Sequence, residues 1–339
     1  MNKKIIAMAI AAATAAPAFA DVTVSGAVRQ SIDHVDNGNT NYEAWQINDR
    51  LSNLKFSGNE DLGNGLKAIF SIQYFLGISN ERASSTDLDD DGGEFNVGAY
   101  AFGQGNAFVG LAGDFGTVLV GRHDHPVKMS TGRLDVFSNT IADNGMTFQN
   151  GADLRANGAI AYVSPSFSGL KIAAAMVPGE DGAVGETADG LADAWSVAAM
   201  YSNGGLYASL GFEEGDTGMD GVTAAQDYDQ TRVGIGYTMD AFHANVVYTD
   251  LDAANGAAND YDSWKIAGTY TMGNNKFKIQ YWDQDYDAST TDEDGWAIGI
   301  DHNFSKRTQA QINYMSIDDN GGTANSDLDV FSVQMNHSF

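Results

Sequence analysis

The amino-acid sequence alternates apolar and polar residues with a period of two, in stretches of about ten residues that recur along the whole chain. A clear example is the run at 276–281, in which Phe277, Ile279 and Tyr281 take every second position. Half-buried β-strands produce this pattern because successive side chains point to opposite faces of a sheet. The sequence therefore predicts a protein made of strands, and either a soluble β-sandwich or a membrane β-barrel would show the alternation.

Two features favour a membrane barrel. The polar face of the strands is small or hydrophilic, as a water-filled lumen requires, and aromatic residues concentrate near the strand ends (Trp195, Tyr201, Trp264, Tyr270, Tyr281, Trp296, Phe304). Only 4 of 339 residues are proline, which suits long strands because proline cannot donate to a β-ladder. No apolar run beyond residue 20 approaches the length of a membrane-spanning helix.

The connections between the stretches fall into two length classes. Short ones lie at 59–65, 113–116, 164–169, 202–205, 239–241, 272–275 and 305–307, and long, acidic, Gly- and Asn-rich ones lie near 34–42, 77–98, 123–153, 178–193, 213–229, 251–262, 283–294 and 317–328. Outer-membrane barrels have short periplasmic turns and long extracellular loops. The sequence therefore predicts an all-β fold, a sixteen-stranded antiparallel transmembrane β-barrel, as one domain over 21–339.

The first twenty residues have the pattern of a secretory signal peptide. Lys3 and Lys4 precede a short apolar stretch at 5–16, and Ala18-Phe19-Ala20 fits the small-residue cleavage rule. We expect residues 1–20 to be removed on export, and we expect the mature chain to reside in the outer membrane of a Gram-negative bacterium.

Composition excludes several functional classes. A formal charge of -27 argues against nucleic acid as a partner, because phosphate binding needs clustered cations. The absence of cysteine excludes disulfide frameworks and thiol nucleophiles. None of the 6 histidines stands in a nucleophile motif, so we expect no catalysis. His123-Asp124-His125 lacks an evident third metal ligand, and we expect a structural role for it.

Several collinear motifs resemble the general diffusion porins of Gram-negative outer membranes. They are the strand-turn-strand stretch at 54–70 (LKFSGNEDLGNGLKAIF), the motifs at 107–111, 113–117 and 120–122, the stretch at 162–170 and the terminal Phe339. The resemblance covers residues 21–339. It implies a homotrimer of sixteen-stranded barrels among outer-membrane lipids and lipopolysaccharide, with the third long loop, about 123–153, folded into the lumen. It also implies passive passage of ions and small hydrophilic solutes.

Members of this family narrow the pore between acidic residues on the third loop and basic residues on the wall. The matching positions are Asp135 and Asp143 on the loop and Arg155 on the wall. Asn53 and Gly105 stand where the family usually has arginine, so the basic wall is thinned. Arg29 and Lys55 fall on the lumen-facing parity and could substitute in part, whereas parity leaves the face of Arg50 open.

The acidic loops and the thinned basic wall predict a pore that prefers cations, because acidic rings select cations in channels. The alternative interpretation is that the acidic residues only keep the outer surface soluble. Asp87, Asp89 and Asp91 match part of a calcium-binding loop, but Gly98 replaces the bidentate glutamate. We expect no cofactor and favour a merely solvated loop there, with a weak Ca²⁺ site as the alternative.

Two other functions stay open at this point. A substrate-specific channel would show a row of aromatic residues at lumen-facing positions, which the sequence does not display. A non-conducting barrel that acts as an adhesin or binds envelope components would show no conductance in a planar bilayer.

Overall fold

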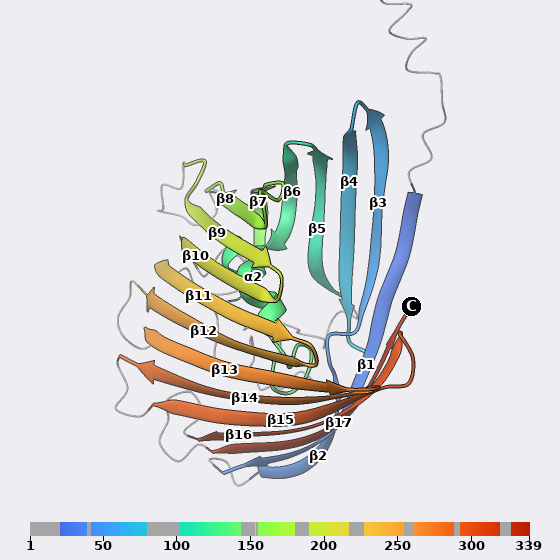
Figure 1. The fold of residues 1–339 in the computed structure, drawn as a ribbon, viewed down its shortest axis with the longest axis vertical. Helices are drawn as coiled ribbons and strands as arrows, with labels where there is room; N and C mark the ends of the chain where they lie inside the picture. Colours follow the sequence, from blue (N-terminus) through green and yellow to red (C-terminus); the bar gives the residue numbers. More distant parts are fainter. Residues whose placement is uncertain are drawn as a thin grey trace, which may run out of the picture.

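The computed structural model describes residues 21–38, 42–79, 102–143, 153, 155–179, 190–216, 227–253, 260–287, 292–318 and 327–339. Its strands form one antiparallel sheet that closes on itself where β1 pairs with β17 (Figure 1). The elements are β1 (Asp21–Asn37), β2 (Tyr42–Asp49), β3 (Asn53–Gly63), β4 (Leu66–Leu76), β5 (Phe102–Gly113), β6 (Gly116–Asp124), α2 (Pro126–Thr131), η1 (Gly132–Leu134), β7 (Arg155–Val163), β8 (Leu170–Val177), β9 (Ala194–Asn203), β10 (Leu206–Asp216), β11 (Asp227–Met239), β12 (Phe242–Ala253), β13 (Tyr261–Met272), β14 (Asn275–Tyr286), β15 (Glu293–Asn303), β16 (Thr308–Asp318) and β17 (Leu328–Ser338).

The seventeen labelled strands occupy sixteen positions in the barrel. β2 pairs with the second half of β1 and β3 pairs with its first half, so β2 and β3 form one barrel strand interrupted at residues 50–52. We call residues 49–52 the kink. The predicted sixteen-stranded antiparallel barrel is therefore confirmed.

The alternation read from the sequence separates the two faces of the wall. Apolar residues at every second position point outward and are exposed on the single chain, for example Val109 (61%) and Ile279 (59%). Outward aromatic residues lie near both ends of the strands. Trp264 packs on Tyr281 at the long-loop end, and Phe242 packs on Tyr270 at the turn end. These positions match the aromatic girdles expected at the two membrane interfaces.

The short connections and the chain end complete the ladder. Gly273, in the turn between β13 and β14, adopts φ +61, a conformation that glycine reaches without steric cost. The last residue, Phe339, exchanges two backbone hydrogen bonds with Gly26 of β1, at 3.0 and 3.2 Å. Within the described residues, no helix has the length and hydropathy of a membrane span.

Several strands run further into the acidic segments than the sequence predicted. β1 continues to Asn37, β10 to Asp216 and β12 to Ala253, although long loops were expected to begin at about 34, 213 and 251. Charged residues are compatible with a strand where they point away from the hydrocarbon or lie beyond it. The difference matters because it fixes the face on which those acidic residues lie.

Candidate pore constriction

The third long loop lies inside the barrel, as the sequence analysis expected. It begins with α2 and η1, which pack against β9, β10, β11 and β12 (Figure 1). Further along the loop, the side chain of Gln280 donates to the carbonyl of Ala142, and that of Gln334 donates to the carbonyl of Asn139, both at 2.9 Å. The described part of the loop therefore crosses the lumen from β9 and β10 to β17 and narrows the passage.

An apolar cluster holds the middle of the loop against the wall. Leu134, Phe137 and Ile141 are 0–2% exposed and share one core with lumen-facing wall residues, among them Trp282, Met315, Ile317, Leu328 and Val330. The Lys278 ammonium also lies over the Phe137 ring, 4.6 Å from the ring centroid. Burial of side chains of this size stabilises docking by about 1.5–3 kcal/mol each, so the loop is a packed part of the wall.

Gly299 of β15 provides the space for this packing. A Cβ at position 299 would lie 3.0 Å from Cε1 of Phe137 and 2.3 Å from Oδ1 of Asn313. We expect Gly299→Ala to weaken loop docking by about 1–3 kcal/mol, the usual cost of overpacking. Faster hydrogen exchange at 134–143, in a barrel that otherwise unfolds normally, would show it.

Gly268→Ala is the matched control for that substitution. Its Cβ would meet only ordinary contacts, the nearest at 3.5 Å from the carbonyl oxygen of His243. Equal exchange rates at 134–143 in both variants would contradict the role assigned to Gly299.

Two ion pairs, which we call the clasp, hold the two ends of the loop. Arg155 Nε lies 3.1 Å from Asp124 Oδ1 and joins the start of the loop to its end. Arg232 Nη1 lies 2.6 Å from Asp153 Oδ1 and ties the end of the loop to β11. Burial alone would raise the pKa of Asp153, but the positive charges of Arg232, Lys128 and His125 outweigh it and lower that pKa.

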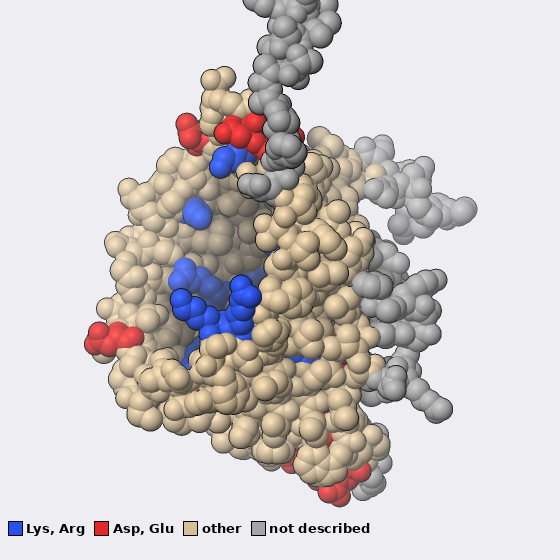
Figure 2. Space-filling model, turned by 90° about the vertical axis from the view of Figure 1, so that its right-hand side faces the viewer, with Lys and Arg blue, Asp and Glu red and all other residues tan. Residues whose placement is uncertain are grey.

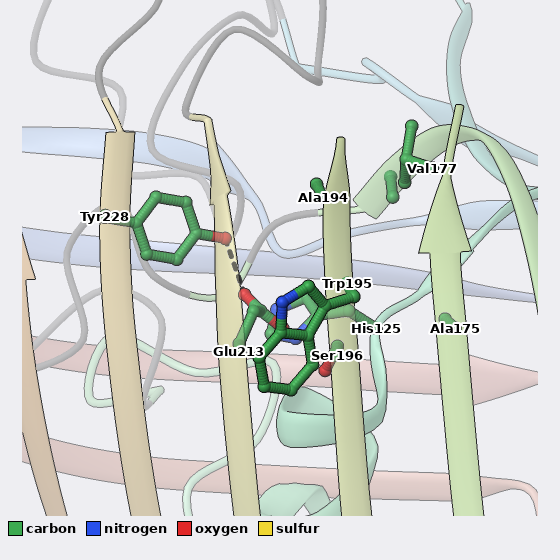
Figure 3. A pocket seen from close by; sticks show the side chains of 9 residues that line it. His125, Ala175, Val177, Ala194, Trp195, Ser196, Glu213 and Tyr228 are labelled. Carbon is green, nitrogen blue, oxygen red and sulfur yellow. Dashed lines mark hydrogen bonds and ion pairs between the residues drawn. The ribbon is translucent and has the colours of Figure 1, made fainter. Parts of the chain in front are cut away.

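A second set of contacts fixes the start of the loop beside the clasp. His125 pairs with Glu213 of β10, and the Tyr228 hydroxyl of β11 donates to the same carboxylate (Figure 3). His125 is also the N-cap residue of α2, with its Nδ1 3.3 Å from the backbone nitrogen of Lys128. The surrounding small pocket is lined by alanines and Val177. The structural role predicted for His125 agrees with this arrangement.

The structure brings some of the predicted constriction residues together and separates others. Asp143 is buried, accepts the backbone N–H of Asn139 and lies within electrostatic range of Arg29. Asp135 accepts the backbone N–H of Phe137 at 2.9 Å, and its charge acts on Lys265 and Lys278, on the wall to which the loop is docked. Arg155 is engaged in the clasp.

Comparison with known proteins identifies the family to which this barrel belongs. The model of the family described as Gram-negative porin matches residues 7–322. The chain belongs to the Gram-negative porin family. Among curated relatives, this porin is 30% identical over 323 residues to outer membrane porin protein 32 of Delftia acidovorans, covering 91% of this chain and 87% of that protein. It is 27% identical to major outer membrane protein P.IB of Neisseria meningitidis serogroup B, covering 92% of both.

Solved structures share the fold of this porin. An anion-selective porin from Comamonas acidovorans aligns with a TM-score of 0.77 at 24% identity, over 94% of this chain and all of that one. OmpT of Vibrio cholerae, in a trimer form, aligns with a TM-score of 0.65 at 15% identity, over 94% of this chain and 99% of that one. The family and the barrel together place this porin in the outer membrane.

The lumen side of the wall contains further basic residues besides Arg29, Lys55 and Arg155, and among them is Arg50, whose face parity had left open. Arg50 points inward and is 9% exposed, with Nη2 2.5 Å from Asp33 Oδ2. On the docked wall, Arg232 and Lys265 are fully buried, and Lys278 pairs with Asp301 at 2.8 Å. Lys55 lies on the lumen side of β3, opposite Gln73 of β4. The next cross-strand pair on the same face, Ser57–Ser71, includes the buried Ser71, and this identifies the face as the inner one. Arg50, Arg232, Lys265 and Lys278 are thus buried cations on the lumen side, whereas Lys55 and Arg29 are partly exposed there.

The acidic residues of the strands lie mainly on the other face. They occupy the outward parity near the long-loop ends (Asp36, Glu43, Glu214, Asp229, Asp250, Asp252, Asp262, Asp283, Asp285, Asp294, Asp318, Asp329). Outward tyrosines donate to several of them, as Tyr314 does to Asp329 at 2.8 Å. Figure 2 agrees, since Lys and Arg gather inside the opening of the barrel while the visible Asp and Glu lie at its margins. These carboxylates therefore do not line the described lumen.

Two further expectations concern ligands. Four lumen-facing aromatic residues (Tyr207, Tyr228, Tyr261, Trp282) are at most 5% exposed and offer no stacking surface to a solute. Phe108 and Tyr286 also lie on the lumen side and are half-buried, but they stand on different strands, β5 and β14, and form no row. Among the described residues, no group of three or more His, Asp or Glu is arranged to hold a metal ion. Asp87, Asp89 and Asp91, the predicted weak Ca²⁺ site, lie outside the described residues.

Proposed function

We propose that this porin is a passive diffusion channel whose waist favours small anions over cations, in place of the cation preference that the sequence predicted. The observation that carries the proposal is the segregation of charge across the wall. Basic side chains lie in the lumen, whereas most of the strand carboxylates lie on the outer face near the loops. Charges inside a narrow, low-dielectric passage act strongly on passing ions.

Charge pairing inside the lumen also supports a preference for anions. Asp33, Asp124, Asp153 and Asp301 each form an ion pair with a lumen cation, so their charges are largely offset locally. Among the described residues, no carboxylate lies within ion-pair distance of Lys55. Screening over about 8 Å at physiological salt weakens the effect of carboxylates beyond the wall. The solved relative from Comamonas acidovorans is itself described as anion-selective.

The reversal potential in a KCl gradient tests this proposal. Purified protein reconstituted in a planar bilayer is expected to give open-channel steps, with a reversal potential of the sign for chloride preference. Conductance that rises with salt without saturating would support diffusion over a specific binding site. A reversal potential of the opposite sign would contradict the anion preference, and the absence of steps would contradict the channel function itself.

We also propose that the channel is a homotrimer embedded among outer-membrane lipids and lipopolysaccharide. The continuous apolar outer face and the trimer form of the Vibrio cholerae relative support this assembly. Light scattering of the detergent-solubilised protein is expected to give the mass of three chains. We propose no catalytic step, and the weak Ca²⁺ site at Asp87, Asp89 and Asp91 remains a secondary proposal.

A further inference from the structure

The kink is a strained interruption of an otherwise regular barrel strand. Leu51 adopts φ +56, a left-handed conformation that a bulky non-glycine residue rarely takes. Such conformations are strained and persist only where surrounding contacts enforce them. The contacts of the kink therefore show what the strained backbone holds in place.

Four hydrogen bonds of the kink converge on Arg29 of the neighbouring strand β1. Ser52 Oγ accepts the backbone N–H of Arg29 at 2.8 Å and donates to its carbonyl oxygen at 3.1 Å. The backbone N–H of Arg50 donates to the same carbonyl oxygen at 3.2 Å. The carbonyl oxygen of Leu51 accepts from Arg29 Nη1 at 2.6 Å. The kink thus forms hydrogen bonds with both the backbone and the guanidinium of Arg29.

The hydrogen bond to the Leu51 carbonyl oxygen restricts the Arg29 side chain. An unrestrained arginine side chain has many accessible rotamers and would sample many positions in a wide lumen. Bonded to Leu51, the Arg29 guanidinium stays near the wall, within electrostatic range of Asp143 on the third loop. Asp49 Oδ1 accepts the N–H of Ser52 at 2.7 Å and steadies the kink from its other end. Arg29 is therefore fixed between the kink and the loop.

The kink also changes which residues face the water. Before it, Trp45 and Ile47 are more than 60% exposed on the outer face, so the even-numbered residues up to Arg50 point inward. After it, the odd-numbered residues Lys55 and Ser57 point inward. A regular strand could not direct both Arg50 and Lys55 into the lumen, because side chains alternate strictly. The extra residue in the kink makes this possible, as a β-bulge does.

We infer that the kink sets the ion preference of the pore, and that Ser52 and Leu51 are positioning residues that act through Arg29. The inference rests on the proposed function, since it assumes a waist that discriminates ions. Neither residue carries a charge or needs to touch the passing ion. Their effect on selectivity should therefore vanish when the Arg29 guanidinium is absent.

A double-mutant cycle on reversal potentials tests the inference. Ser52→Ala removes both hydroxyl contacts with Arg29 and is expected to lower the chloride preference, reproducing most of the shift that Arg29→Ala causes. In the Arg29→Ala background, Ser52→Ala is expected to cause no further shift, because coupled residues are non-additive. Ser52→Thr retains the hydroxyl and should restore the parent value. Leu51→Gly retains the carbonyl and should also keep the parent value.

The controls separate positioning from general damage. Ser263→Ala makes the same chemical change at another buried, lumen-facing serine, on β13, and should leave the reversal potential at the parent value. Ser52→Cys preserves the volume and serves as a second variant should Ser52→Ala fail to fold. An anion-preferring parent whose Ser52→Ala variant keeps the parent reversal potential, or shifts it additively with Arg29→Ala, would overturn the inference alone. A parent without anion preference would instead contradict the proposed function.

Discussion

Replacing Arg29 and Lys55 together by glutamate is expected to reverse the ion preference of the channel, from chloride to potassium. Both side chains lie on the lumen side of the wall, and neither belongs to the clasp. Each substitution exchanges a positive for a negative charge at the passage. A change of only about 1.4 kcal/mol in the relative free energy of the two ions alters their ratio tenfold. The sign of the reversal potential in a KCl gradient measures the outcome.

A double variant in a turn provides the matched control. Lys306→Glu with Arg307→Glu changes the net charge of the chain by the same amount, but both residues are exposed in the turn between β15 and β16. We expect this control to retain chloride preference, because the charges lie outside the narrow passage. If the lumen variant kept the parent sign, or if the turn variant also reversed it, selectivity would not be set at Arg29 and Lys55.

The barrel could be predicted from the sequence because the period-two pattern determines the face of each side chain. Residues such as Ile279 and Lys278 differ by one position and therefore lie on opposite faces of the wall. The same parity placed Arg29 and Lys55 in the lumen, and the lengths of the connections gave the number of strands. These features are local, so a single sequence contains them.

Other features depended on geometry that alternation cannot express. The kink changes the parity between Trp45 and Lys55, so the inward direction of Arg50 could not be read by counting. Its only sequence signal is the Asp-Arg-Leu-Ser interruption between two alternating runs. Pairings such as Asp153 with Arg232 join residues 79 apart and depend on how the third loop folds back onto the wall.

The cation preference was predicted from the acidic long loops and the thinned basic wall. Acidic residues near a loop were taken to line the pore mouth. Because β1, β10 and β12 extend into these acidic segments, residues such as Asp36 and Glu214 keep the outward parity. Net charge alone does not determine which side of a barrel wall carries that charge, so composition alone does not determine selectivity.

Arg232→Met is expected to release the end of the third loop from the wall. Asp153 is about nine-tenths buried and lies 2.6 Å from the Arg232 guanidinium. Removing one partner of a buried ion pair costs about 3–5 kcal/mol, since the remaining charge is left desolvated. Hydrogen exchange at 134–143 should accelerate by about a hundredfold, and the open-channel current should become noisier. Arg232→Met with Asp153→Leu, which removes both charges, is the control and should restore most of the protection.

Docking of the third loop should depend on pH in opposite directions in the parent and in Arg232→Met. In the parent, the pKa of Asp153 is lowered on folding, so the clasp contributes stability above the ordinary carboxyl pKa and loses it as the pH falls. In Arg232→Met the cation that most lowers this pKa is gone, so burial should raise it and acid should neutralise the buried charge. Acidification should therefore loosen the loop of the parent and tighten that of the variant. If exchange at 134–143 changed with pH in the same direction in both, the pairing of Asp153 with Arg232 would not control loop docking.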